Sequence, residues 1–147
     1  MNTGLAIGGL DVLRGWLRKA AGRLRDRAAL HARVGRTLTG WVDANFDADG
    51  RLATGTSAGW PPLRARTLAA RRRAGLGTRP LQATGRLRAG VRLRSDAASA
   101  TLDDPVPYAA VHQLGLGVPA RPFLPTRTQT ARIARPVAEA FVREALR

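Results

Sequence analysis

Two histidines and one adjacent acid pair are the residues of this sequence best suited to acid–base or metal chemistry. His31 and His112 have no HExxH context, and neither lies in a cluster of His, Asp and Glu residues with the spacing of metal ligands. The pair Asp103-Asp104 stands between a predicted strand and two prolines, a position typical of a solvated turn. We therefore expect structural histidines and no metal site.

Nucleophilic catalysis and phosphate binding find no support either. The chain has no cysteine, which excludes disulfides, thiol catalysis and cysteine-based zinc sites. The glycine-containing pieces at 55–59 and 75–77 lack the Gly-Lys-Ser/Thr ending of a phosphate loop. No serine is expected to form the nucleophile elbow of a serine hydrolase, and no nucleophile, base and orienting group form a set. The prediction is a protein that is not an enzyme and has no cofactor.

The charge of the chain is its most extreme bulk property. Lys and Arg number 25 against 10 Asp and Glu, which gives a net charge of +15. Such a surface attracts polyanions. Lys19 is the only lysine, and the arginines are suited to bidentate contact with phosphate or carboxylate groups. Codon bias in a GC-rich genome explains the preference for arginine equally well, but it does not explain the net charge.

Length and composition predict one soluble domain with a modest core. The 147 residues match a single ordinary domain, 1–147, and only 5% of them are aromatic. No uncharged run reaches the length of a membrane span, and the first ten residues lack the pattern of a signal peptide. Six large aromatic residues should therefore carry much of the core: Trp16, Trp41, Phe46, Trp60, Phe123 and Phe141.

The first third of the chain has the periodicity of amphipathic helices. Apolar residues recur at intervals of three and four, and the basic residues lie mostly off these stripes. One stripe consists of Leu10, Leu13, Leu17, Ala20 and Leu24, and the next of Leu30, Val34, Leu38, Trp41 or Val42, and Phe46. Asp47, Asp49 and Gly50 end the second helix.

The middle of the chain predicts a loop, a short helix and a hairpin. The polar segment near 47–62 indicates an exposed loop closed by Trp60. Residues 63–75 favour a short and very basic helix. After Thr84-Gly85 the chain alternates, with Val91 and Leu93 on one face and Arg92 and Arg94 on the other, which predicts two short strands joined around Asp96-Ala97.

The last third predicts a short helix, an extended segment and a C-terminal helix. Residues 108–113 favour one or two helical turns, and the prolines keep the segment near 117–126 extended. Pro136 suits the first turn of the last helix but would kink a helix that began at Thr126. The predicted fold class is α+β, with N-terminal amphipathic helices, a small antiparallel sheet in the second half and a C-terminal helix.

Four short blocks carry a resemblance to a known family. They are Gly59-Trp60-Pro61-Pro62-Leu63 with Thr67, Leu81-x-x-Thr84-Gly85-x-Leu87, Tyr108-Ala109-Ala110-Val111-His112-Gln113-x-Gly115, and Val118-Pro119-Ala120-Arg121-Pro122-Phe123-Leu124. In order and approximate spacing, the blocks resemble the phage virion morphogenesis family over roughly Leu30 to Phe141. Pro62, directly before the leucine, and Pro136 depart from the family pattern.

The resemblance implies a structural virion protein that completes the phage tail or joins it to the head. It implies a homo-oligomer, a hexameric ring by analogy with tail-completion proteins, located in the tail or neck of the virion and assembled in the cytoplasm of the host bacterium. Expected partners are the neighbouring tail tube or terminator proteins and the head–tail connector proteins. The block residues expected to shape the domain or its assembly are Trp60, Leu63, Thr67, Leu81, Thr84, Gly85, Tyr108, His112, Gln113, Gly115, Pro119, Arg121, Pro122 and Phe123.

A second class of function stays open from the charge. A basic DNA-binding module without catalytic activity would use the arginines between 64 and 94, although no aromatic residues are interleaved with them. The candidate DNA-facing residues are Arg71, Arg72, Arg73, Arg92 and Arg94. The two classes are compatible, because a connector ring with a basic lumen would make non-specific contact with double-stranded DNA.

Overall fold

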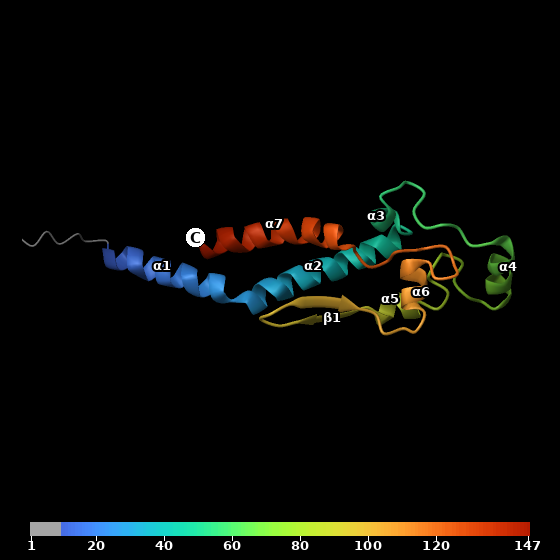
Figure 1. The fold of residues 1–147 in the computed structure, drawn as a ribbon, viewed down its shortest axis with the longest axis horizontal. Coiled ribbons are helices and arrows are strands. Elements are labelled where there is room, and N and C mark those ends of the chain that lie inside the picture. The colour runs from blue at the N-terminus through green and yellow to red at the C-terminus, as the bar shows by residue number, and fades with distance from the viewer. Residues whose placement is uncertain (1–9) are drawn as a thin grey trace, which may run out of the picture.

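Two consecutive helices form the first part of the computed structural model, which describes residues 10–147. The apolar stripes predicted from the sequence become α1 (Leu10–Arg25) and α2 (Arg27–Asp47). The break falls at Asp26, whose carboxylate accepts the backbone N–H of Ala29 (3.0 Å) and so caps α2. The two helices follow one another as a long, bent rod that sets the elongated shape of the molecule (Figure 1).

The C-terminal helix α7 (Arg127–Ala145) runs along α2 and reaches α1. It begins at the N-cap Thr126, where the side chains of Thr126 and Gln129 each bond the other residue's backbone N–H. Pro136 therefore lies in the middle of the helix and not in its first turn. Because it is on the exposed side, the carbonyl left without an N–H partner can be hydrated.

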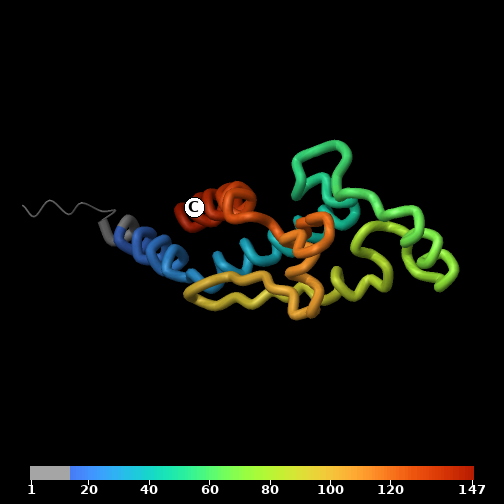
Figure 2. The backbone as a smooth tube through the Cα atoms, turned by 45° about the vertical axis from the view of Figure 1, so that its right-hand side comes forward, coloured from blue at the N-terminus to red at the C-terminus, as the bar shows by residue number. Residues whose placement is uncertain are grey.

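A two-stranded antiparallel hairpin covers the other side of α2. Strands β1 (Arg92–Ser95) and β2 (Ala100–Asp103) pair with Leu93 opposite Leu102. The hairpin and α7 flank α2 from opposite sides in both views (Figures 1 and 2). Gly35 permits this close packing, since a Cβ there would lie 2.4 Å from a methyl carbon of Leu93. Asp96 shapes the turn by accepting the N–H groups of Ala98 and Ser99.

Four short helices gather around and beyond the C-terminal end of α2 (Figure 1). They are α3 (Arg51–Thr54), α4 (Ala65–Arg73), α5 (Arg86–Gly90) and α6 (Ala109–Leu114). Helix α3 lies within the segment predicted as a loop, and α5 lies where the chain was expected to alternate. Gly85 has a left-handed backbone (φ 74°) and starts α5, whose Leu87 is buried.

The main core lies at this same end of the molecule, and we call it the hub. It consists of the buried residues Val42, Phe46, Trp60, Leu81, Leu87, Val106, Ala109 and Phe123. Six aromatic residues were expected in the core, and this expectation is wrong for Trp16, which is 38% exposed on α1. Helices and a small antiparallel sheet together confirm the predicted α+β class.

Candidate functional site

Trp60 ties the 48–62 segment to the proline-rich segment. Its ring packs edge-on against Phe46 with 5.3 Å between ring centroids, and its Nε1 donates to the carbonyl of Pro122 (2.8 Å). Gly50, with φ of 83°, lies directly beneath the indole, because a Cβ at that position would be 2.2 Å from Cδ1 of the ring. These contacts hold the 48–62 segment against the end of α2 and the proline-rich segment.

Gln113 joins α6 to the same proline-rich segment. Its Oε1 accepts the backbone N–H groups of Phe123 (2.9 Å) and Leu124 (3.0 Å), and its Nε2 donates to the carbonyl of Leu124 (3.2 Å). The N–H of Arg121 donates to the carbonyl of His112 (2.7 Å). A single amide side chain thus takes the place of a neighbouring strand for a segment whose prolines cannot pair regularly.

Arg121 is the most buried charged side chain of the described residues, with 6% of it exposed. Its Nε donates to the carbonyl of Pro61 (2.9 Å) and its Nη2 to that of Pro62 (3.1 Å). Trp60 and Arg121 therefore cross-link the two proline-containing blocks reciprocally, each side chain binding a carbonyl of the other block. Among residues 10–147 no carboxylate pairs with Arg121, so its guanidinium acts as a cross-link between carbonyls.

His112 lines a pocket of about 280 Å³ together with side chains of the second and third blocks. The lining residues are Arg71, Leu81, Ala83, Thr84, Leu87, Tyr108 and His112. Burial holds the pKa of His112 below its ordinary 6.5, and the positive charges of Arg121 and Arg71 lower the pKa further. No carboxylate lines this pocket. The arrangement gives a neutral histidine without an acid partner, which suits packing against Tyr108 and not proton transfer.

The remaining block residues divide between backbone roles and the surface. Gly115 ends α6 in a left-handed conformation (φ 73°), and Leu81 is buried with a positive φ of 59°. Leu63 and Thr67 are half-buried, whereas Pro119 is exposed. The structure therefore brings residues of all four blocks together in the hub and leaves the outer residues of the blocks at the rim.

Two residues that hold segments around the hub were not identified from the sequence. Asn45 is fully buried, and its Oδ1 accepts the N–H of Ala53 (2.9 Å). Arg79 donates to the carboxylate of Asp49 (2.9 Å) and to the carbonyls at the end of α2. Because Asn45 directly precedes the apolar Phe46, the sequence could have indicated a buried polar contact at Asn45. Arg79 lies in a polar stretch, and no sequence pattern indicates its contacts.

The five candidate DNA-facing arginines do not share one surface within the subunit. Helix α4 lies at the far end of the molecule and the hairpin lies beneath α2 (Figures 1 and 2). Arg71 donates to the carbonyls of Gly77 and Arg79, and Arg94 pairs with Asp103 (3.1 Å). Arg73 donates to its own helix, while Arg72 and Arg92 are exposed.

The pair Asp103-Asp104, predicted to lie in a solvated turn, is part of the folded structure around β2. Asp103 belongs to β2, and the carboxylate of Asp104 accepts the N–H of Val106 (2.9 Å). Each carboxylate also has one buried oxygen without a partner. The expectation of a fully solvated pair was wrong, because strand pairing extends to Asp103 and the following turn folds back onto the hub.

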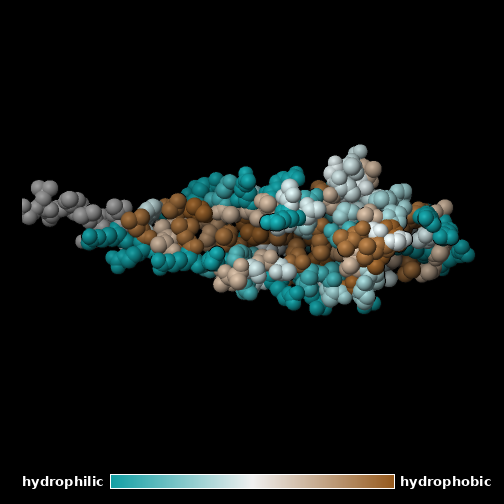
Figure 3. Space-filling view, viewed as in Figure 1, coloured by the Kyte–Doolittle hydropathy of each residue, from teal (hydrophilic) through white to brown (hydrophobic). Residues whose placement is uncertain are grey.

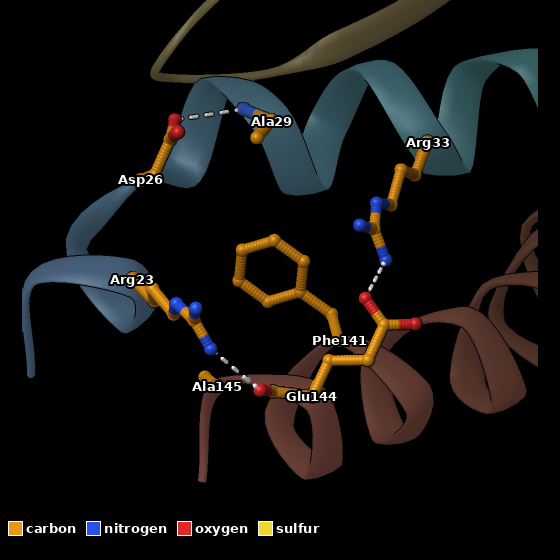
Figure 4. Close-up of a pocket in the computed structure, with 7 residues that line it drawn as sticks. All are labelled: Arg23, Asp26, Ala29, Arg33, Phe141, Glu144 and Ala145. Carbon is orange, nitrogen blue, oxygen red and sulfur yellow. Dashed lines mark hydrogen bonds and ion pairs between the residues drawn. The ribbon is translucent and has the colours of Figure 1, made fainter. Parts of the chain in front are cut away.

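A second pocket, of about 370 Å³, lies where α1, α2 and α7 meet (Figure 4). Arg33 pairs with Glu144 (2.6 Å), and its guanidinium lies 5.4 Å from the ring centre of Phe141. Arg23 of α1 donates to the backbone carbonyl of Glu144 (3.1 Å). These contacts fix α1 against the end of α7, and the pocket holds no nucleophile that a base could activate.

The Gly-x-Ser-x-Gly letters of serine hydrolases do occur in this chain, at residues 55–59 and centred on Ser57. This stretch follows helix α3 and not a strand, so it is not a strand-to-helix elbow. Ser57 is exposed, and within residues 10–147 it bonds neither histidine. Gly55 caps α3, and Gly59 has a positive φ directly before Trp60, so both glycines are explained by the left-handed backbone conformation at their positions.

Between residues 10 and 147, no three His, Asp or Glu side chains are grouped closely enough to hold a metal ion. No helix in that range has the length and apolar character needed to cross a membrane.

The polar side chains around the hub hold distant segments of the chain together. A protein-family model described as the phage virion morphogenesis family matches residues 10–142. The chain belongs to this family, and its place is therefore in the assembly of bacteriophage particles. No curated protein and no solved structure matches the chain.

Proposed function

We propose that this chain is a ring-forming subunit that completes the phage tail or joins it to the head. The observation that carries the proposal, beside family membership, is that a subunit of charge +15 exposes large apolar side chains in two separate places. A soluble monomer rarely exposes such groups of side chains, whereas a subunit that becomes buried in an assembly requires them.

The first apolar surface is the strip along α1 and the end of α7, formed by Trp16, Leu17, Leu24, Val142 and Leu146. The second is the loop 114–118, formed by Leu114, Leu116 and Val118. A ring built from identical subunits uses two such surfaces per copy. We expect a hexamer that matches the sixfold symmetry of a tail, with tail tube or terminator proteins on one side and connector proteins on the other.

Deletion of the gene tests this function. A missing joint should leave filled heads and separate tails, counted by electron microscopy of lysates, and adding purified protein should restore joined particles. Ser57→Ala is a matched control, because it removes the hydroxyl of the hydrolase-like pattern and should restore joining fully. Normal joined particles after a clean deletion would refute the proposed function, and failure of Ser57→Ala protein would point to an enzyme.

Charge favours a second, accompanying activity, which is weak binding of duplex DNA. Arg72 on α4 and Arg92 on β1 are exposed and make no ion pair with the described carboxylates. Binding should be independent of sequence and should fall steeply between about 50 and 200 mM salt, because phosphate neutralisation releases counterions. Assembly of like-charged subunits should instead strengthen with salt. An affinity for DNA that does not change with salt concentration, or that is specific for one sequence, would contradict this second activity.

A further inference from the structure

The apolar strip exists because α7 covers only part of α1. Ala20 is buried where the end of α7 lies on α1, and α1 continues beyond that end (Figures 1 and 2). Trp16 and Leu24 share the stripe of Ala20 at intervals of four, and yet they are 38% and 41% exposed. Figure 3 shows apolar surface following this seam between hydrophilic borders. The strip is an apolar face that its own subunit leaves uncovered.

The borders of the strip are basic, which restricts what can cover it. At about 100° per residue, Arg14 and Arg23 fall beside opposite edges of the α1 stripe. Arg18 and Arg25 lie on the back of the helix, and Lys19 is exposed as well. Two strips packed on each other would bring basic borders face to face, at a cost in repulsion. The strip therefore does not favour its own copy as partner, and a neutral apolar surface fits it better.

The loop 114–118 is such a surface, since its sequence Leu-Gly-Leu-Gly-Val carries no charge. Among the residues whose exposure the structure describes, Leu114 and Leu116 are the most exposed large apolar ones, at 66% and 57%. The base of the loop is fixed, because the N–H groups of Gly115 and Leu116 both donate to the carbonyl of Val111 (3.0 Å each). The loop thus presents two leucines on a rigid turn, with little conformational entropy to lose on binding.

We propose that the loop 114–118 of one subunit docks on the α1–α7 strip of the next copy. The proposal rests on the proposed ring, and it identifies the surfaces that form it. Helices α1 and α6 lie toward opposite ends of the molecule (Figure 1), so each copy offers one surface to each neighbour. Repetition of this head-to-tail contact gives a closed ring when the rotation between neighbouring copies divides a full turn evenly. The stem of Arg23 at the border packs along the leucines, while its guanidinium keeps the hydrogen bond to the carbonyl of Glu144 (3.1 Å).

Complementary variants test the docking by sedimentation. Leu17→Gln with Leu146→Gln breaks the strip, and Leu114→Gln with Leu116→Gln breaks the loop, both without a change of charge. Each variant alone should remain monomeric where the wild type forms rings. A mixture of the two should form a 1:1 dimer and nothing larger, because one intact strip meets one intact loop. Rings from either variant alone, or a mixture that stays monomeric, would overturn the proposal.

Cysteine cross-linking provides a second readout that does not depend on polar substitutions. The chain has no cysteine of its own. The double variant Leu17→Cys, Leu116→Cys should give a ladder of disulfide-linked oligomers on oxidation, whereas Ser99→Cys, Leu116→Cys should not. Dimers from Leu17→Cys alone would show that the strip pairs with itself, and absence of the ladder in assembled rings would also refute the docking.

The function and the docking fail in different ways. If rings persist in both glutamine variants, the docking is wrong and the joining function stands. If the variants lose the ring while phage carrying them still join heads to tails, the docking holds and the proposed function is wrong. Wild-type protein that is monomeric at every concentration and salt would overturn the docking itself.

Discussion

The two ends of the molecule are built in opposite ways. At the hub end, Phe46, Trp60 and Phe123 are buried, and hydrogen bonds join segments that are about 60 residues apart, such as Trp60 to Pro122. At the other end, α1 and the last turns of α7 form what we call the arm, where Ala20, Phe141 and Ala145 are buried but Trp16 and Leu17 remain exposed.

The difference indicates that one end of the chain stabilises the folded subunit and the other end is available for assembly. The hub supplies most of the apolar burial that stabilises the subunit, because its large aromatic rings are removed from water completely. The arm is an incomplete layer whose uncovered strip adds little to the stability of the monomer. Substitutions in the hub should therefore change folding, and substitutions in the arm should change assembly.

The largest effect is expected for Trp60→Ala. The substitution removes a buried ring and its hydrogen bond to Pro122, and should lower the free energy of unfolding by about 4 kcal/mol. Trp16→Ala, the same change on the arm, should cost less than about 1 kcal/mol. Urea unfolding followed by circular dichroism measures both. Equal losses would remove the distinction between the two ends.

Gly50→Ala should be the next most damaging change. The new Cβ would require a left-handed alanine and would clash with the Trp60 ring, a loss of about 3 kcal/mol in total. Gly55→Ala is the matched control, because Gly55 also has a positive φ (68°) but a Cβ added there would have no atom within 4 Å. Its cost should be only the backbone strain, about 1 kcal/mol. Equal losses in thermal unfolding would mean that the Trp60 contact is unimportant.

Acid should weaken the hub through His112, by a smaller amount. Because the folded protein holds the pKa of His112 below the ordinary 6.5 of the unfolded chain, stability from this group is fully present above pH 6.5. As pH falls below 6.5, the unfolded chain binds the proton first and the free energy of unfolding decreases, until the lowered native pKa is passed. Urea unfolding between pH 7.5 and 5 should show this slope in the wild type and a weaker one in His112→Gln. Identical slopes in the wild type and in His112→Gln would show that His112 does not cause the loss of stability in acid.

The smallest effect on stability should come from the strip itself. Leu17→Gln should change the free energy of unfolding by no more than about 0.5 kcal/mol, because half of the side chain is already in water. The same variant should assemble more weakly than the wild type in concentration-dependent sedimentation. A variant that unfolds easily would place Leu17 in the folding core and not in an interface.

Periodicity predicted the long elements of this fold but not the short ones. The apolar stripes of α1 and α2 and the alternation around Leu93 are local signals, and each appears in the structure. Helices α3 and α5 depend on left-handed glycines such as Gly85, whose conformation is set by tertiary packing and leaves no repeating pattern.

The site was predictable as blocks but not as contacts. The sequence singled out Trp60, Gln113 and Arg121, yet their partners are backbone carbonyls and N–H groups of distant residues, which carry no side-chain signature. The charge pattern does not indicate that Arg71 and Arg94 also make contacts within the subunit. Which arginines are exposed depends on the hairpin register and on the path of the 74–80 segment.

The most direct test of the central claim, that this chain is a ring-forming structural subunit of the virion, is a cryo-electron microscopy map of the purified particle. We predict a closed ring of copies of this fold at the end of the tail that faces the head, with each 114–118 loop on the α1–α7 strip of its neighbour. A complete particle without this chain, or one that holds it only as single copies along the DNA, would contradict the account.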